Sequence, residues 1–238
     1  MKTILPVVSA LAALTLAGMS ATAATYPDPT GDGALVGTGG GILDITSVEV
    51  NNTASDLIFK INLAGDPTAT DWGKYMIGID SKPGGDPAGN GWGRPIGMSS
   101  GMDYWVGSWA DSGNGAEIRN WTGAAWNLQS ATYNPNPDNL SFAKDASSVT
   151  IKFNFAGLGL APGSSFFFDV YTSGGGGTDS AIDALANPAQ TVANWSDYYN
   201  SGNNVDSYTL AQVPEPSVCV LLGLGGLALI PRAYRRHA

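Results

Sequence analysis

The chain has 238 residues, with 20 Asp or Glu, 11 Lys or Arg, and a formal net charge of −9 at pH 7. We therefore expect no nucleic-acid partner, because phosphate binding needs clustered Lys and Arg. The single cysteine (Cys219) and the single histidine (His237) lie near the C-terminus, so the body of the chain has no disulfide, no Cys/His zinc site, no Ser-His-Asp triad and no Cys-His dyad.

Residues 1–23 have the three parts of a secretory signal peptide. Lys2 supplies the basic start, a largely apolar run follows from Ile4 to Leu16, and Ala21-Thr22-Ala23 supplies the small residues of a cleavage site. We expect cleavage after Ala23 and export of the remaining chain. Residues 24–212 then carry 19 acidic and 7 basic side chains, a net charge of −12 that suits solubility and cation binding.

Residues 24–212 are predicted to form one all-β domain, a single antiparallel, jelly-roll-like β-sandwich. Polar and apolar residues alternate in 57–63, with Ile58 as the exception, and in 149–155, which is typical of strands with one buried face. Seven less regular strands separated by Gly, Pro, Asn and Asp turns complete the pattern of a sandwich. They are 42–50, 74–80, 102–109, 115–121, 124–129, 165–172 and 205–210. A helix is predicted at 179–186, ending before Pro188.

The first part of this domain contains a turn of D-x-x-G-D type, then an acidic residue that enters a strand, then an alternating strand. This order resembles the opening of family 9 carbohydrate-binding modules and of DOMON-like domains. The matching positions are Asp28, Gly31, Asp32, Asp44, Leu57, Phe59 and Ile61. The resemblance covers about 40 residues, and it implies a β-sandwich with sugar binding or a structural calcium ion.

Several of the same acidic residues are candidate calcium ligands on chemical grounds. Calcium takes about six to eight oxygen ligands, and Gly-rich turns let backbone carbonyls contribute some of them. The predicted set is Asp28, Asp32 and Asp44, and Asp80 with Asp86 is a second option; neither has the spacing of an EF-hand loop. The alternative is that these residues only begin turns, as Asp commonly does.

Three tryptophans are the predicted ligand-binding residues. Trp105 and Trp109 share one face of the strand 102–109, on the order of 14 Å apart, and Gly107 leaves space between them. Trp92, in the preceding loop, adds a third aromatic surface on which a sugar could stack. The alternative is that Trp105 and Trp109 fill the core of the sandwich, since large aromatic side chains are usually buried.

No catalytic group is predicted, and we expect a protein that is not an enzyme. A glycosidase needs two carboxyl groups roughly 5–9.5 Å apart. The only glutamates of residues 24–212, Glu49 and Glu117, fall in predicted strands, where they are expected to face outward. Ser141 and Lys144 fit the S-x-x-K pattern of serine enzymes, but its companion motifs are absent. A polysaccharide-acting enzyme remains an alternative.

Residues 213–238 form a separate C-terminal segment. Pro214, Glu215 and Pro216 come first, then 14 uncharged residues from Ser217 to Ile230, and then Arg232, Arg235 and Arg236. The apolar run is shorter than the about 20 residues that cross a bilayer as a helix, and the arginines favour a cytoplasmic end. This order resembles the PEP-CTERM sorting signal of Gram-negative bacteria; an ordinary C-terminal anchor and a tail packed on the domain are the alternatives.

The PEP-CTERM resemblance implies a partner and a location. An exosortase of the inner membrane would recognise the tail and cleave it, so that the anchor is transient and the protein reaches the cell surface or the extracellular space. A role in extracellular polysaccharide or biofilm material is implied as well. We therefore predict a carbohydrate-binding module, with a structural surface component lacking glycan affinity as the alternative.

Overall fold

The computed structural model describes residues 23–213, which belong to one compact unit. The predicted signal peptide, up to residue 22, lies outside this range. The sorting residues also lie outside it, namely Pro214, Glu215, Pro216, Arg232, Arg235 and Arg236. In the part of the chain that is described, no helix is long and apolar enough to cross a membrane.

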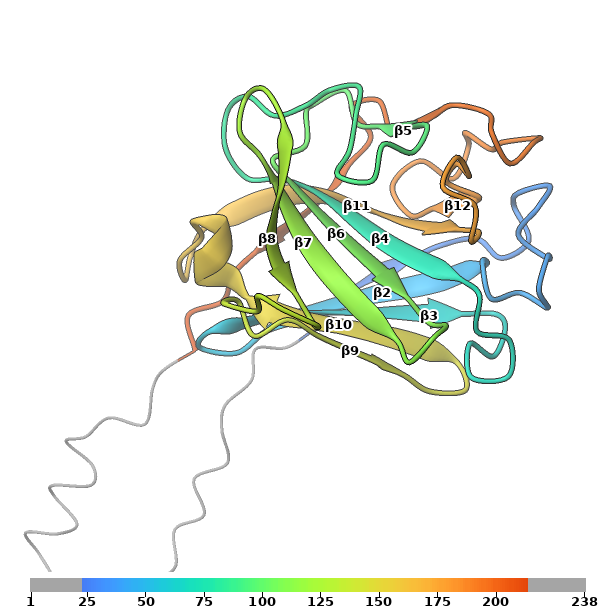
Figure 1. Ribbon diagram of the computed structural model, residues 1–238, viewed down its shortest axis with the longest axis horizontal. Coiled ribbons are helices and arrows are strands. Elements are labelled where there is room, and N and C mark those ends of the chain that lie inside the picture. The colour runs from blue at the N-terminus through green and yellow to red at the C-terminus, as the bar shows by residue number, and fades with distance from the viewer. Residues whose placement is uncertain (1–22, 214–238) are drawn as a thin grey trace, which may run out of the picture. The chain divides into compact units, whose positions relative to one another are not determined.

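The fold is an antiparallel β-sandwich, and its first layer is a five-stranded sheet with the order β1-β2-β3-β10-β9 (Figure 1). Its strands are β1 (Ala24–Pro27), β2 (Ile45–Asn52), β3 (Asp56–Leu63), β9 (Ser141–Lys144) and β10 (Ser148–Asn154). All neighbouring pairs in this sheet are antiparallel.

The second layer is a seven-stranded sheet with the order β12-β11-β4-β6-β7-β8, in which β14 also pairs with β11. Its strands are β4 (Lys74–Asp80), β6 (Tyr104–Trp109), β7 (Gly115–Trp121), β8 (Trp126–Ala131), β11 (Ser165–Ser173), β12 (Asp183–Ala184) and β14 (Asp206–Thr209). Outside the two sheets, β5 (Ile96–Gly97) pairs in parallel with β13 (Tyr199–Asn200), and a 3₁₀ helix (η1, Phe155–Leu158) follows β10.

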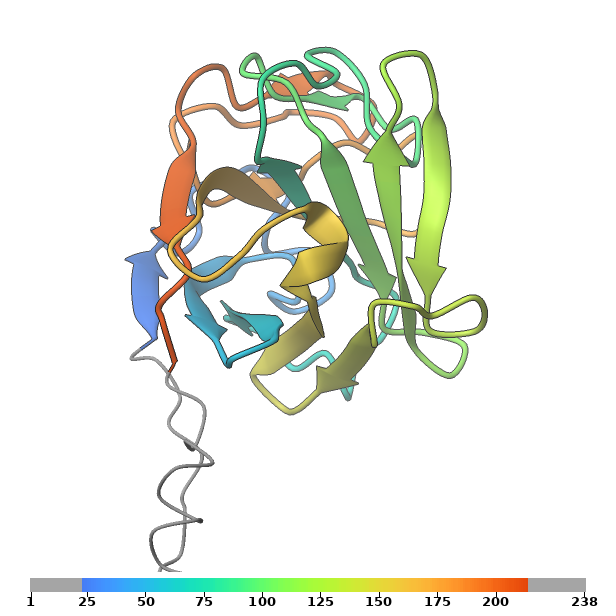
Figure 2. The same ribbon diagram turned by 90° about the vertical axis from the view of Figure 1, so that its left-hand side faces the viewer.

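A hydrophobic core fills the space between the two sheets because alternate residues of their strands point into it. In β3, Leu57, Phe59 and Ile61 are buried and Ile58 is not, as the alternation predicts. The rings of Phe59 and Phe168, from opposite sheets, meet edge to face with centroids 5.3 Å apart. Figure 2 shows the sandwich from the side, with β1 next to β14. The Tyr26 hydroxyl joins these two strands by donating to the Ser207 carbonyl at 2.6 Å.

A second hydrophobic core covers the outer face of the seven-stranded sheet. Met76, Trp105 and Tyr171 project from β4, β6 and β11 to this side and are fully buried there. The covering side chains come from the connecting segments 28–44, 81–103 and 174–205, which include the short strands β5, β12 and β13. They are Val36, Ile42, Leu43, Ile96, Met98, Met102, Ala181, Ile182, Ala184, Val192 and Tyr199. The central strands of this sheet are therefore buried on both faces, which explains why their apolar runs are nearly continuous.

All the predicted strands have a counterpart in the structure, whereas five short strands (β1, β5, β9, β12 and β13) were not predicted. Each of the nine predicted strands is present, and 74–80 and 115–121 coincide with β4 and β7. The helix predicted at 179–186 is wrong. That segment consists of turns and β12, and Ala181, Ile182 and Ala184 are all buried in the second core. All six residues from 180 to 185 are buried, whereas a helix packed on the sheet by one face would turn some of six consecutive side chains toward solvent.

Candidate functional site

The outer face of β6 carries two tryptophans in different surroundings. Trp105 and Trp109 do lie on the same face of this strand, as expected from the period of two. Trp105, however, is 0 % exposed. Its indole stacks on Tyr171, with ring centroids 5.9 Å apart and an interplanar angle of 21°. Trp105 therefore belongs to the second core, and it cannot present its face to a ligand.

The space expected above Gly107 is also occupied. A Cβ atom at this position would overlap the indole of Trp92, which lies directly over the glycine. Trp92 meets Trp105 edge to face at 6.2 Å, and the Arg94 guanidinium lies 5.4 Å from the centre of the Trp92 ring. Gly107 therefore allows Trp92 to pack on the sheet, rather than leaving a gap for a sugar between two tryptophans.

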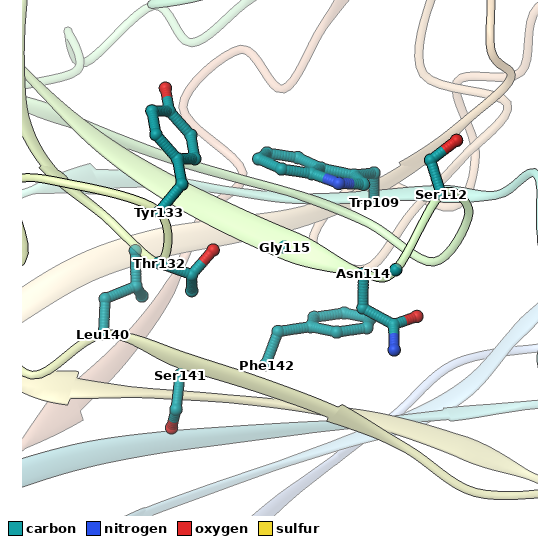
Figure 3. A pocket seen from close by; sticks show the side chains of 10 residues that line it. Trp109, Ser112, Asn114, Gly115, Thr132, Tyr133, Leu140, Ser141 and Phe142 are labelled. Carbon is teal, nitrogen blue, oxygen red and sulfur yellow. The ribbon is translucent and has the colours of Figure 1, made fainter.

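Trp109 is half-buried and borders an open recess. The recess has a volume of about 560 Å³, and we call it the aromatic cleft. It is lined by Trp109, Ser112, Gly113, Asn114, Gly115, Thr132, Tyr133, Leu140, Ser141 and Phe142. Figure 3 shows Trp109 and Tyr133 along one side of the cleft, with Phe142 and Leu140 facing them. Apolar ring surface and short polar side chains thus alternate around an open space.

Tyr133 is the most exposed large aromatic side chain of the described residues. It is 60 % exposed, and its ring lies 6.3 Å from that of Trp109 at an interplanar angle of 40°. Trp109 in turn packs on Gly115, where a Cβ atom would overlap its indole. These contacts hold two aromatic rings at the mouth of the cleft, where their outer faces meet solvent.

Glu117 fixes the orientation of this aromatic surface from behind. Its carboxylate accepts hydrogen bonds from the Trp92 indole N–H, from Arg119 Nε at 2.8 Å and from the Tyr133 hydroxyl at 3.0 Å. Burial raises the pKa of Glu117, but the hydrogen bonds from Arg119 and Trp92 outweigh burial and hold this pKa below its usual range. Glu117 is therefore an ionised anchor for side chains on both sides of Trp109.

A smaller recess lies on the other side of Trp109. It has a volume of about 280 Å³ and is lined by Lys74, Trp92, Arg94, Trp109, Asp111 and Gly177. Lys74 is paired with Asp111 at 2.9 Å. Arg94 donates to the Ser173 hydroxyl and to the carbonyls of Asp179 and Gly174. Trp92 and Trp109 therefore both line this recess, whereas Trp105 is buried and does not line it.

The two glutamates considered for a glycosidase lie on different sheets. Glu49 is on β2 and pairs with Lys60 at 3.6 Å, whereas Glu117 is on β7. Each points away from the core between the sheets, so the sandwich separates them and they do not form a carboxylate pair. Ser141 and Lys144, three residues apart on β9, point to opposite faces of that strand, so the S-x-x-K pattern has no geometric basis.

A second cluster of functional groups lies where the N-terminal segment meets β12. Carboxylate oxygens of Asp28, Asp32 and Asp183 all lie within 4.8 Å of one another. Asp28 directly follows β1, Asp32 lies in the next turn, and Asp183 begins β12. Two of the three predicted calcium ligands are thus brought together, and the third member comes from the far end of the domain.

Asp44, the remaining predicted ligand, has another role in the structure. Its two carboxylate oxygens accept hydrogen bonds from the Gly31 N–H, at 3.1 and 3.2 Å, and so hold the turn that carries Asp32. Asp183 replaces it in the cluster, and the sequence carries no local sign of this because Asp183 was assigned to a helix. Asp80 and Asp86, the second option, belong to no group of three metal-ligating side chains among the described residues, and Asp86 caps the turn at Ala88 and Gly89.

The acidic cluster is electrostatically unbalanced. Asp28 is 8 % exposed, and all four carboxylate oxygens of Asp28 and Asp32 lack a hydrogen-bond partner. Burial, followed by the charges of Asp183 and Asp32, raises the pKa of Asp28 to about 9. Burial and the neighbouring Asp32 likewise raise the pKa of Asp183 to about 7. Among the residues described, the four ion pairs all involve other carboxylates.

No protein-family model and no curated protein matches the chain. The two sites just described and the order of residues at the two ends of the sequence are therefore the features that bear on function.

Proposed function

We propose that the protein is an exported, non-enzymatic module that binds polysaccharide through the aromatic cleft. The order of residues 213–238, which resembles a PEP-CTERM signal, supports export and sorting. In this proposal an exosortase is the processing partner, the C-terminal segment anchors the chain in the inner membrane only transiently, and the domain ends at the cell surface or outside the cell, in polysaccharide or biofilm material.

The observation that carries the binding proposal is the pair Trp109 and Tyr133 at the mouth of the cleft. Their rings expose apolar faces, and such faces bury the C–H surface of a sugar ring. Glu117 and the packing on Gly115 fix the rings in advance, so that little side-chain entropy is lost when a ligand binds.

The other lining groups suit a hydroxyl-rich ligand. Asn114, Ser112 and Thr132 line the cleft and offer both hydrogen-bond donors and acceptors. The volume of about 560 Å³ lies within the range of roughly 300–1,000 Å³ that is usual for ligand sites. A saccharide stacked on Trp109 and Tyr133 would have its hydroxyls within reach of these side chains.

The proposed ligand set differs from the three tryptophans expected from the sequence. Trp109 is retained, Trp92 supports the neighbouring recess and Glu117, and Trp105 is left out because it is buried. Tyr133 and Phe142 are added. Neither belongs to a pattern that would mark it in the sequence, since Tyr133 follows β8 in a turn and Phe142 lies on the short edge strand β9.

The test is affinity electrophoresis of residues 24–213 through gels that contain neutral or uronic-acid polysaccharides. We expect selective retardation by at least one polysaccharide, and a loss of affinity of about tenfold or more in Trp109→Ala and in Tyr133→Ala, because central aromatic contacts commonly carry more than about 1 kcal/mol. Phe167→Ala is the matched control, since Phe167 is 50 % exposed but lies outside the cleft.

Other outcomes favour the alternatives. No retardation on a broad panel, together with self-association of the folded domain, would favour a structural surface component. Retardation that is unchanged in Trp109→Ala and Tyr133→Ala would place glycan binding elsewhere on the domain. Release of sugar fragments from any polysaccharide of the panel would favour an enzyme.

A further inference from the structure

We propose that Asp28, Asp32 and Asp183 bind a divalent cation, for which calcium is the best chemical match, and that this ion fastens the two sheets together at the N-terminal edge of the sandwich. This site is separate from the aromatic cleft and does not depend on glycan binding. Asp28 and Asp32 are neighbours in the sequence, and Asp183 supplies the third carboxylate of the site.

The geometry is that of converging ligands. The three carboxylates come from positions separated by 155 residues, between Asp28 and Asp183, yet they offer oxygens within 4.8 Å of one another. Like charges at this separation repel, so chain folding alone does not favour such an arrangement. A cation between the oxygens converts the repulsion into attraction.

Asp28 is a buried carboxylate without a hydrogen-bond partner. Its side chain is more than nine-tenths buried, at 8 % exposure, and neither of its oxygens has a hydrogen-bond partner. The oxygens of Asp32 are in the same condition. Buried carboxylates are normally hydrogen-bonded, paired or bound to a metal ion. The first two kinds of partner are missing at Asp28 among the described residues, so its ionised form would need a bound cation.

The neighbouring contacts hold Asp183 in position for this role. One of its oxygens accepts from the Ile45 N–H at 2.6 Å, and the other accepts from the Ala184 N–H at 2.8 Å. Each carboxylate oxygen has further lone pairs, so these bonds orient the group and still leave it able to bind an ion. Metal ligands are typically fixed in this way by a second set of hydrogen bonds.

The donor set identifies the kind of ion. Every donor is a carboxylate oxygen, and the described residues contain neither His nor Cys, so the site suits a hard cation rather than one that prefers nitrogen or sulfur. Three carboxylates, two of them outside the strands and one at the start of β12, give a negative site. Calcium accepts such irregular oxygen sites, whereas magnesium demands near-octahedral geometry and keeps most of its water.

The position of the site gives the ion a structural consequence. Asp28 directly follows β1, an edge strand that pairs with β2 in its sheet, and Asp183 begins β12 in the other sheet. The turn after Asp28 also contributes Val36 to the second core, where Ile182 lies. The ion therefore joins the two sheets and the loop that covers the second core.

The test uses calcium titration and thermal unfolding of residues 24–213 after treatment with a chelator. We expect one calcium ion per chain by calorimetry, and an increase in Tm of about 5–10 °C when free calcium is about 100 times Kd. Asp28→Asn and Asp183→Asn should each weaken calcium binding at least tenfold. Asp71→Asn is the matched control, because Asp71 is exposed and is not a member of the cluster.

The sign of the stability change separates a metal site from an ordinary structural carboxylate. Without calcium, Asp28→Asn should be at least as stable as the original chain, because it replaces a buried carboxyl group that has no hydrogen-bond partner with a neutral amide of the same shape. With calcium, the original chain should be the more stable of the two. The proposal is overturned if no calcium binds, if both Asn variants bind it as tightly as the original chain, or if Asp28→Asn destabilises the chelated protein. Equal stabilisation by magnesium would overturn the assignment to calcium.

Discussion

Trp105 and Trp109 lie four residues apart on one face of β6, yet their surroundings differ because of what covers each indole. Tyr171 and Trp92 cover Trp105 on both sides. Trp109 lies at the last position of β6, beside Gly115, and borders two recesses. The period of two correctly predicts which face a residue occupies, but it carries no information on how far a loop extends over that face.

This difference predicts unequal costs for two similar substitutions. Trp105→Ala should lower the free energy of unfolding by about 3–5 kcal/mol, because it leaves a cavity in the second core. Trp109→Ala should cost clearly less, since part of the ring already contacts water. Urea denaturation of both variants measures the difference. Equal losses would mean that the two indoles are buried to the same extent.

At the scale of elements, the long Gly-rich loops are a third layer of the protein. They are rich in glycine and polar residues, which is typical of surface loops, but together with the short strands β5, β12 and β13 that they contain they also contribute eleven of the side chains of the second core. Arg94 holds one of them in place. Its guanidinium donates to the Ser173 hydroxyl and to the Gly174 and Asp179 carbonyls, on either side of the run of four glycines at 174–177.

Removing Arg94 should therefore loosen this loop before the rest of the domain. Arg94→Met keeps an extended apolar side chain but removes all three hydrogen bonds. We expect amide hydrogen exchange in 173–182 to become at least tenfold faster, with little change in β3 and β10. Lys60→Met is the control, because the exposed pair of Lys60 and Glu49 should contribute less than about 1 kcal/mol. Equal acceleration throughout the domain would show that Arg94 acts on global stability instead.

The elements that were predicted and those that were missed differ in length and in partners. Strands such as β3 and β10 carry a clear alternation that follows from one buried face. The missed strands β1, β5, β9, β12 and β13 have two to four residues each, too few for a pattern to show. A helix was predicted for 179–186 because Ala and Leu favour helices. Packing against the sheet determined the observed conformation instead.

At the scale of the whole molecule, one buried carboxyl group should make stability depend on pH. Asp169 is fully buried on β11 and accepts hydrogen bonds from Val170 N–H, Ala186 N–H and the Ser201 hydroxyl. Burial raises the pKa of Asp169 to about 7, despite these hydrogen bonds. The titratable groups that interact electrostatically with Asp169 are Asp28, Asp206, Tyr171 and Tyr199.

Because the pKa of Asp169 is higher in the folded chain than in the unfolded chain, the folded state binds more protons between about pH 4 and pH 7. Stability should therefore fall as the pH rises through this window, by an amount on the order of 4 kcal/mol, and should be unaffected by Asp169 outside it. Asp169→Asn keeps both backbone hydrogen bonds and lacks the titration. The free energy of unfolding of this variant, relative to the original chain, should rise from pH 4 to pH 7, and a constant difference would contradict the assignment.

By itself, the sequence determined the class of fold, the positions of the nine main strands and the absence of His and Cys chemistry in the body of the domain. These properties follow from local alternation and from composition, which need no knowledge of long-range contacts. The sequence also pointed to Asp28, Asp32 and Trp109, because they lie in short local patterns.

Only the tertiary structure decided which residues act together. It joined Asp183 to Asp28 across 155 positions, placed Trp92 over Gly107, and set Tyr133 beside Trp109. It also buried Trp105 under loops distant in the sequence. The physical reason is that a site in a sandwich is assembled at the ends of strands and under loops, where the neighbours of a side chain come from remote parts of the chain and leave no periodic trace around it.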